Sequence, residues 1–145
     1  MAIKQISVFL ENKPGTLREM CSVLAGHKID MRALSLAETK DFGIARMIVD
    51  DTIATTNVLK EEGFVNQLTP VVAVCIPDEP GGLNRVLEIF TENNINLEYM
   101  YAFLGRTGGR AYMIFRIGGS NEKKAEAALT AAGIRLLAQE DIADL

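Results

Sequence analysis

The chain has 145 residues and a formal net charge of −4, with 15 basic against 19 acidic side chains. This acidic balance disfavours an electrostatic contact with nucleic acid or a membrane surface, so we expect a small molecule or another protein as the partner. Hydrophobic residues make up 48% of the chain and charged residues 23%, which is typical of a folded globular protein. The length suits one domain or two small ones.

The apolar segments of the chain predict a cytoplasmic protein. Lys4 and Gln5 interrupt the first ten residues, which lack the long apolar core of a secretion signal. No apolar run reaches the roughly 18 residues that a membrane-spanning helix needs. Cys21 and Cys75 stand in apolar patterns without the spacing of a metal site, so we expect free, buried thiols.

The first half of the chain predicts six elements in the order strand, helix, strand, strand, helix, strand. Alternating apolar residues indicate the strands, and apolar residues spaced i, i+3, i+4, i+7 indicate the first helix. The expected elements are a strand over 3–10, a helix from the Pro14-Gly15 loop to Gly26-His27, strands over 31–38 and 43–50 joined by TKDF, a helix capped by Asp51 or Thr52 and ending at Gly63, and a short strand from Phe64.

The second half repeats this order. Pro80-Gly81 follows Pro14-Gly15 at an offset of 66 residues, and the helical and strand patterns recur at the same offset. The expected elements are a strand over 70–77, a helix from Pro80-Gly81 to Asn93-Asn94, strands over 97–104 and 110–117 joined by GRTGG, a helix capped by Ser120 or Asn121 and ending at Gly133, and a short strand from Ile134. Each half therefore predicts an α+β, ferredoxin-like β-α-β-β-α-β domain, the first over 1–68 and the second over 69–145. Because no Gly/Ser-rich linker separates the halves, we expect them to pack as a rigid pair.

Each Pro-Gly loop is a candidate binding site. We expect each proline to begin its helix, where its missing N–H would have no helical partner. The first turn of a helix presents unpaired N–H groups that suit a carboxylate or a phosphate, and glycine lets a ligand approach the backbone. Asn12 and Asp78 precede the prolines by two residues and offer acceptors for an ammonium group. An α-amino acid is therefore a sensible ligand, although Pro-Gly is also a common turn that binds nothing.

The segments ENKPGTLREM with HKIDM, and PDEPGGLNRV with NNINLEYM, resemble the ACT domain. This domain is the ligand-binding regulatory module of aspartate kinase, phosphoglycerate dehydrogenase and other enzymes of amino-acid metabolism. The resemblance covers the whole chain as two tandem ACT units. It implies two antiparallel sheets joined side by side into one eight-stranded sheet with the helices on one face. It also implies a free amino acid bound at the seam between the units, and allosteric signalling of its level to a biosynthetic enzyme or within a homodimer.

The candidate ligand-binding residues lie in the two loops and in the second strand of each unit. In the family, an Asn or Asp before the Pro-Gly pair and another at the start of the second strand help to hold the amino acid. Residues 34–37 and 100–103 are expected to line the pocket of the other unit. The full set is Glu11, Asn12, Lys13, Pro14, Gly15, Thr16, Leu17, Asp30, Met31, Leu34, Ser35, Asp78, Glu79, Pro80, Gly81, Gly82, Leu83, Asn96, Leu97, Met100 and Tyr101. We predict no catalytic residue, no metal site and no cofactor.

Three other functions stay open. The main alternative is a regulatory subunit that acts through contacts with an amino-acid biosynthetic enzyme, with vestigial pockets. RNA-binding modules share this fold, but they need strand aromatics and basic residues that KDFGIARM carries only in part. A small enzyme would need a nucleophile with a base, or acids in a cleft, and the sequence shows no such constellation.

Overall fold

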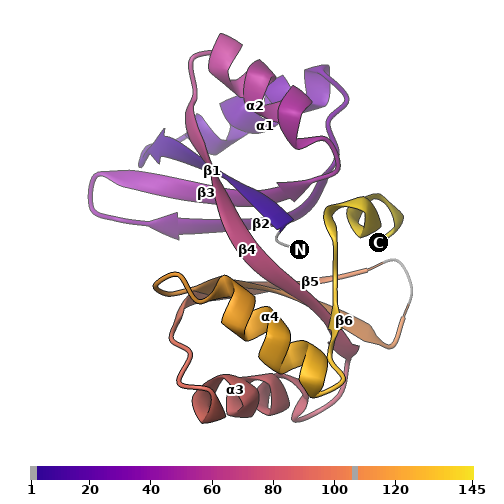
Figure 1. Ribbon diagram of the computed structural model, residues 1–145. Coiled ribbons are helices and arrows are strands. Elements are labelled where there is room, and N and C mark those ends of the chain that lie inside the picture. Colours follow the sequence, from indigo (N-terminus) through magenta and orange to yellow (C-terminus); the bar gives the residue numbers. More distant parts are fainter. Residues whose placement is uncertain (1–2, 106–107) are drawn as a thin grey trace. The chain divides into compact units, whose positions relative to one another are not determined.

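The computed structural model describes residues 3–105 and 108–145 (Figure 1). Its internal contacts divide the chain into two compact units. We call Lys4–Thr69 the first unit, and Pro70–Leu145 together with Ile3 the second unit. Each unit follows the order β-α-β-β-α-β, which confirms the predicted α+β fold of two ferredoxin-like domains.

The first unit is a sheet with two helices on one of its faces (Figure 1). Its elements are β1 (Ile3–Glu11), α1 (Thr16–Gly26), β2 (Met31–Glu38), β3 (Phe42–Val49), α2 (Thr52–Glu61) and the first part of β4 (Val65–Pro77). The strand β3 pairs antiparallel with both β1 and β2. The strands β1 and β2 therefore run in the same direction, and their last residues lie at the same end of the sheet, beside the start of β3. The core consists of Ile6, Val8, Leu10, Met20, Leu24, Ala45, Met47, Val49 and Leu59.

The second unit has the same construction. Its elements are the later part of β4, α3 (Gly82–Glu92), β5 (Leu97–Leu104), β6 (Arg110–Ile117), α4 (Glu122–Ala131), β7 (Arg135–Leu136) and the 3₁₀ helix η1 (Gln139–Asp144). The strands lie in the order β5-β6-β4-β7, all antiparallel to their neighbours. The core consists of Val72, Val74, Ile76, Val86, Phe90, Ile95, Ala111, Phe115, Ile117, Ala125, Leu129 and Ile134.

One long strand, β4, replaces the two separate strands that we predicted around the domain boundary. It runs without a break from Val65 to Pro77. The expected count of eight strands is therefore wrong, and seven strands are present in the described part of the chain. The segment between Phe64 and Pro77 contains no glycine, and its one internal proline is Pro70. The φ of proline is compatible with a strand, provided that its missing N–H is not needed for pairing.

The two prolines do not begin their helices, contrary to our prediction. Gly15 is the N-cap of α1, with φ 90° and ψ −13°, and Gly81 is the N-cap of α3, with φ 85° and ψ −5°. These angles are those of the third residue of a type II turn, which follows a proline at the second position and favours glycine. Each helix therefore begins two residues after its proline.

The second helix of each unit begins differently. In the first unit, the predicted cap is confirmed, since an Asp51 carboxylate oxygen accepts a 3.0 Å hydrogen bond from the Ala54 N–H. In the second unit, Asn121 occupies the N-cap position, but no side chain caps the helix, so our prediction of a side-chain cap is wrong there. The predicted connector GRTGG includes residues 106 and 107, which lie outside the described residues.

Candidate functional site

The Pro-Gly turn of the first unit is closed by a side chain. The Thr16 hydroxyl lies 2.8 Å from the Glu11 carbonyl oxygen and 3.2 Å from the Lys13 carbonyl oxygen. Within the described residues, no carbonyl accepts a hydrogen bond from the Thr16 N–H, whereas the Glu19 N–H already bonds to the Gly15 carbonyl. The first turn of α1 therefore leaves the N–H groups of residues 16 to 18 free for a ligand or for water.

A pocket of about 350 Å³ opens beside this turn. It lies between the end of β1, the start of α1, the end of β2 and the start of β3. Six of our predicted ligand-binding residues line it, namely Glu11, Asn12, Lys13, Gly15, Thr16 and Leu17. The other lining residues are Leu10, Arg18, Leu36, Ala37, Glu38 and Gly43. We call this cavity the first pocket.

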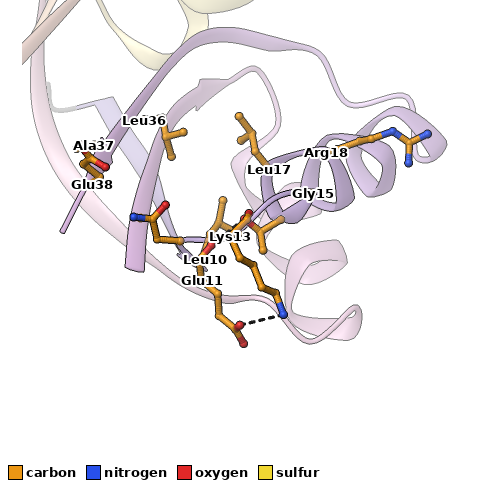
Figure 2. Close-up of a pocket in the computed structure, with 12 residues that line it drawn as sticks. Leu10, Glu11, Lys13, Gly15, Leu17, Arg18, Leu36, Ala37 and Glu38 are labelled. Carbon is orange, nitrogen blue, oxygen red and sulfur yellow. Dashed lines mark hydrogen bonds and ion pairs between the residues drawn. The ribbon is translucent and has the colours of Figure 1, made fainter. Parts of the chain in front are cut away.

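The first pocket has an apolar gap and a charged rim. Figure 2 shows the side chains of Leu17 and Leu36 pointing toward one another across the gap. The Lys13 ammonium lies 3.0 Å from the Glu11 carboxylate, and both side chains are largely exposed. The hydrogen bond to Glu11 and then the attraction of its charge raise the pKa of Lys13 above its ordinary value.

Asn12 ties the loop to the connector between β2 and β3. Its side-chain amide reaches the Thr39 carbonyl oxygen at 3.5 Å, and its backbone N–H reaches the Asp41 carbonyl oxygen at 3.5 Å. Both contacts are long, so each is weak. The side chain of Asn12 therefore remains available at the mouth of the first pocket.

The second unit carries a pocket of about 300 Å³ at the equivalent place. Five predicted residues line it, namely Asp78, Glu79, Gly81, Gly82 and Leu83. The other lining residues are Ile76, Pro77, Asn84, Leu87, Ala111 and Met113. We call this cavity the second pocket. Its described lining contains two carboxylates and no basic side chain, in contrast to the first pocket.

The two turns differ in how they are closed. In the second unit, the Gly82 N–H donates a 3.1 Å hydrogen bond to the Glu79 carbonyl oxygen. A Cβ atom at Gly82 would lie 3.0 Å from the Pro77 carbonyl oxygen, so glycine lets the helix start this close to the end of β4. The position equivalent to Gly82 is Thr16, whose N–H is free. The first pocket therefore offers one more free backbone donor than the second.

The predicted residues in the second strands, other than Leu36 and Ala37, do not line the described pockets. Asp30 pairs with Arg32 at 2.9 Å. The strand β2 starts opposite Val49, at the end of β3, whereas the Pro-Gly turn follows Glu11, which pairs with Phe42 at the start of β3. Asp30 and Asn12 therefore lie at opposite ends of the sheet within the first unit. The predicted residues outside both pockets are Pro14, Asp30, Met31, Leu34, Ser35, Pro80, Asn96, Leu97, Met100 and Tyr101. Their role depends on packing between units and stays a prediction.

Sequence reasoning missed Leu10, Arg18, Glu38 and Gly43 as lining residues of the first pocket, and it assigned Leu36 and Ala37 only to the pocket of the other unit. Leu36 and Ala37 line the pocket of their own unit. The missing signal is the register, because Glu38 pairs with Gly43 and the end of β1 pairs with the same segment of β3. That register brings the end of β2 beside the Pro-Gly loop.

The described residues offer no clear metal site or membrane-spanning helix. Among the described residues, no group of three or more His, Cys, Asp or Glu side chains could hold a metal ion. Both cysteines are free, with Cys75 buried and Cys21 half-buried. In the part of the chain that the structure covers, no helix is long and apolar enough to cross a membrane.

Two βαββαβ units, each with a pocket beside a Pro-Gly turn, define a tandem pair of ferredoxin-like domains. The model of the ACT domain pair family matches residues 1–145, so the chain belongs to this family. Domains of this family are regulatory rather than catalytic, and they are homologous to regulatory domains that bind amino acids.

Solved structures support the assignment. A protein of Bacteroides thetaiotaomicron is 39% identical with a TM-score of 0.92, and the match covers 100% of this chain and 98% of that one. The ligand-free regulatory subunit of aspartate kinase from Thermus thermophilus is 19% identical with a TM-score of 0.65, covering 90% of each chain. The corresponding subunit from Thermus flavus is 18% identical with a TM-score of 0.62, also covering 90% of each chain. These two subunits share the fold. A comparison with curated protein sequences gives no match.

Proposed function

We propose that this protein binds a free α-amino acid in the first pocket and signals the level of that amino acid allosterically. The observation that carries the proposal is the pocket of about 350 Å³ beside the Pro-Gly turn, at the start of α1. The free N–H groups of Thr16 and Leu17 there suit a carboxylate, because the start of a helix also carries partial positive charge. The side chains of Asn12 and Glu11 supply acceptors for the ammonium group.

The acceptor side chains beside the turn favour an amino acid over an anion that carries no ammonium group. A phosphate would use the same N–H donors, but it has no ammonium group for Glu11 and Asn12 to accept from. The second pocket lies at the equivalent place but has one backbone donor fewer, since the Gly82 N–H is already bonded. We therefore propose the first pocket as the higher-affinity site.

Signalling requires that the ligand favours one arrangement of the protein over another, because binding that is equal in both arrangements shifts nothing. We propose that the responding partner is an enzyme of amino-acid biosynthesis in the cytoplasm, or a second copy of the chain in a homodimer. The fold shared with regulatory subunits of aspartate kinase makes this class of enzyme the first to examine.

A thermal-shift screen of the whole chain against the twenty amino acids tests the proposal. A ligand present at 100 times its Kd stabilises the folded protein by about 2.7 kcal/mol. We expect one amino acid, or a group of similar ones, to raise the Tm. If none of the twenty does so at millimolar concentration, the proposal is wrong.

A second candidate function is a regulatory subunit that acts through protein contacts alone. The observation in its favour is the exposed apolar surface of the edge strand β2, where Leu34 and Leu36 lie on one face and are each more than 40% exposed. Co-purification with an enzyme, together with indifference to every amino acid, would favour this candidate over the first.

A further inference from the structure

The apolar gap of the first pocket is formed by two leucines from different elements. Leu17 lies in the first turn of α1 and Leu36 lies near the end of β2, and their side chains point toward one another (Figure 2). Leu36 is 53% exposed, although its partner across the strands, Ala45, is fully buried. An aliphatic group placed between the two leucines would remove this apolar surface from water.

The charged side chains of Glu11, Lys13 and Arg18 point away from the apolar gap. Glu11 and Lys13 pair with one another at 3.0 Å, and Figure 2 shows the pair at the rim, with Arg18 directed away along α1. A charged ligand side chain in the gap would lose water without gaining an opposite charge from these three residues. Glu38 is the one other carboxylate of the lining, and it lies exposed at the end of β2.

The size of the first pocket suits a small ligand. Gly43 lies beneath Leu36, and a Cβ atom there would lie 3.4 Å from a methyl group of Leu36. The volume of about 350 Å³ is at the lower end of the range of roughly 300–1,000 Å³ for small-molecule sites. It therefore suits a single free amino acid better than a peptide or a cofactor.

The second pocket lacks the facing pair. The residue equivalent to Leu17 is Leu83, which lines that pocket, but the residue equivalent to Leu36 is Ala102, which does not. The described residues of the second unit therefore hold no opposing leucine across the gap. For this facing pair, the two units differ at one position of the edge strand, which is Leu36 in β2 and Ala102 in β5.

We propose that the first pocket selects amino acids with an aliphatic side chain, and that Leu36 is the residue that sets this preference. The proposal rests on the proposed function, since it concerns the side chain of the amino acid bound there. Leu17 forms the fixed wall on α1, and Leu36 closes the opposite side.

Isothermal titration of the whole chain with glycine, alanine, valine, isoleucine, leucine, lysine and aspartate tests it. We expect the Kd to fall from glycine to leucine by about fourfold for each methylene buried. The variant Leu36→Ala should weaken the binding of leucine and isoleucine about five- to tenfold while leaving that of glycine unchanged. Because Leu36 is exposed, this variant should keep the Tm of the unmodified chain.

The matched control is Leu34→Ala, which truncates an exposed leucine on the same face of the same strand but outside the first pocket. It should leave every Kd unchanged. Tightest binding of lysine or aspartate, or an equal loss for glycine and leucine in Leu36→Ala, would overturn the selectivity while leaving the proposed function standing. A change in sedimentation of Leu36→Ala without a change in selectivity would show that a second copy covers Leu36, and would also overturn it. Failure of every amino acid to bind the unmodified chain would overturn the proposed function itself.

Discussion

The Gly82 N–H bonds to the Glu79 carbonyl oxygen at 3.1 Å, whereas in the first unit the Thr16 hydroxyl lies 3.2 Å from the equivalent carbonyl oxygen of Lys13. The same turn is thus closed by the backbone in one unit and by a side chain in the other. A side-chain closure leaves the backbone N–H of Thr16 unused. This difference is the physical basis for assigning the ligand to the first pocket.

Replacing Thr16 by valine tests the side-chain closure. Valine keeps the shape of threonine but removes the hydroxyl that lies near two carbonyl oxygens. We expect Thr16→Val to lower the free energy of unfolding by about 1 kcal/mol and to weaken amino-acid binding, because the loop is no longer held against α1. Urea denaturation and titration measure the two effects. The control Thr16→Ser retains the hydroxyl, and if it were as damaging as valine, the hydrogen bonds would not be the cause.

Gly15 is required by backbone conformation and not by space. Its φ is 90°, and no atom lies within 4 Å of the position that a Cβ would take. We expect Gly15→Ala to destabilise the protein by roughly 1–2 kcal/mol through the left-handed conformation alone. Gly15→Asn should be milder, since asparagine adopts this conformation more readily. Equal Tm values for alanine and glycine would contradict the type II turn.

Gly82 is required by close packing. A Cβ there would lie 3.0 Å from the Pro77 carbonyl oxygen and 3.2 Å from a methyl group of Ile76. We expect Gly82→Ala to destabilise the protein by about 1–3 kcal/mol, as overpacking does. The matched control is Gly26→Ala at the end of α1, where no atom lies within 4 Å. That change should be neutral or stabilising by up to about 1 kcal/mol, because alanine favours the helix. Similar denaturation curves for the two variants would contradict the packing argument.

The caps of the two later helices make a matched pair. Asp51 accepts a 3.0 Å hydrogen bond from the Ala54 N–H, whereas Asn121 holds the same position in α4 without a side-chain cap. We expect Asp51→Ala to lower the free energy of unfolding by about 0.5–2 kcal/mol and Asn121→Ala to change it less. The ranking of the two Tm values is the measurement. A larger loss from the asparagine change would show that the cap bond contributes little.

Local chemistry made most of the fold predictable. The ranges of β2, β5 and β6 match the expected ranges because alternating residues between turn segments specify a strand and its ends. The start of α1 was predicted too early because a Pro-Gly pair is compatible with both the start of a helix and a type II turn. Only the φ of Gly15 distinguishes the two structures. The continuity of β4 depends on pairing partners far along the chain, which a local pattern does not contain.

The loop residues of the candidate site were predictable from the sequence, whereas the lining residues from β2 were not. The residues around Pro14 and Pro80 were identified because the turn and the helix start are adjacent in sequence. Leu36 and Glu38 were missed there because their place beside the loop depends on the register of β2 against β3. The 3₁₀ helix η1, which is capped by a 2.8 Å bond from the Ala138 N–H to the Asp141 carboxylate, was also missed, since a six-residue segment carries too little periodicity to be recognised.

The most direct test of the central claim is isothermal titration of the whole chain with each of the twenty amino acids, followed by the same titration of Thr16→Val. We predict saturable binding of at least one amino acid and a weaker Kd in the variant, because the closed turn positions the free N–H groups at the start of α1. Absence of binding by all twenty at millimolar concentration would contradict the claim. Binding that is indifferent to the Thr16 change would place the ligand elsewhere and contradict the assignment to the first pocket.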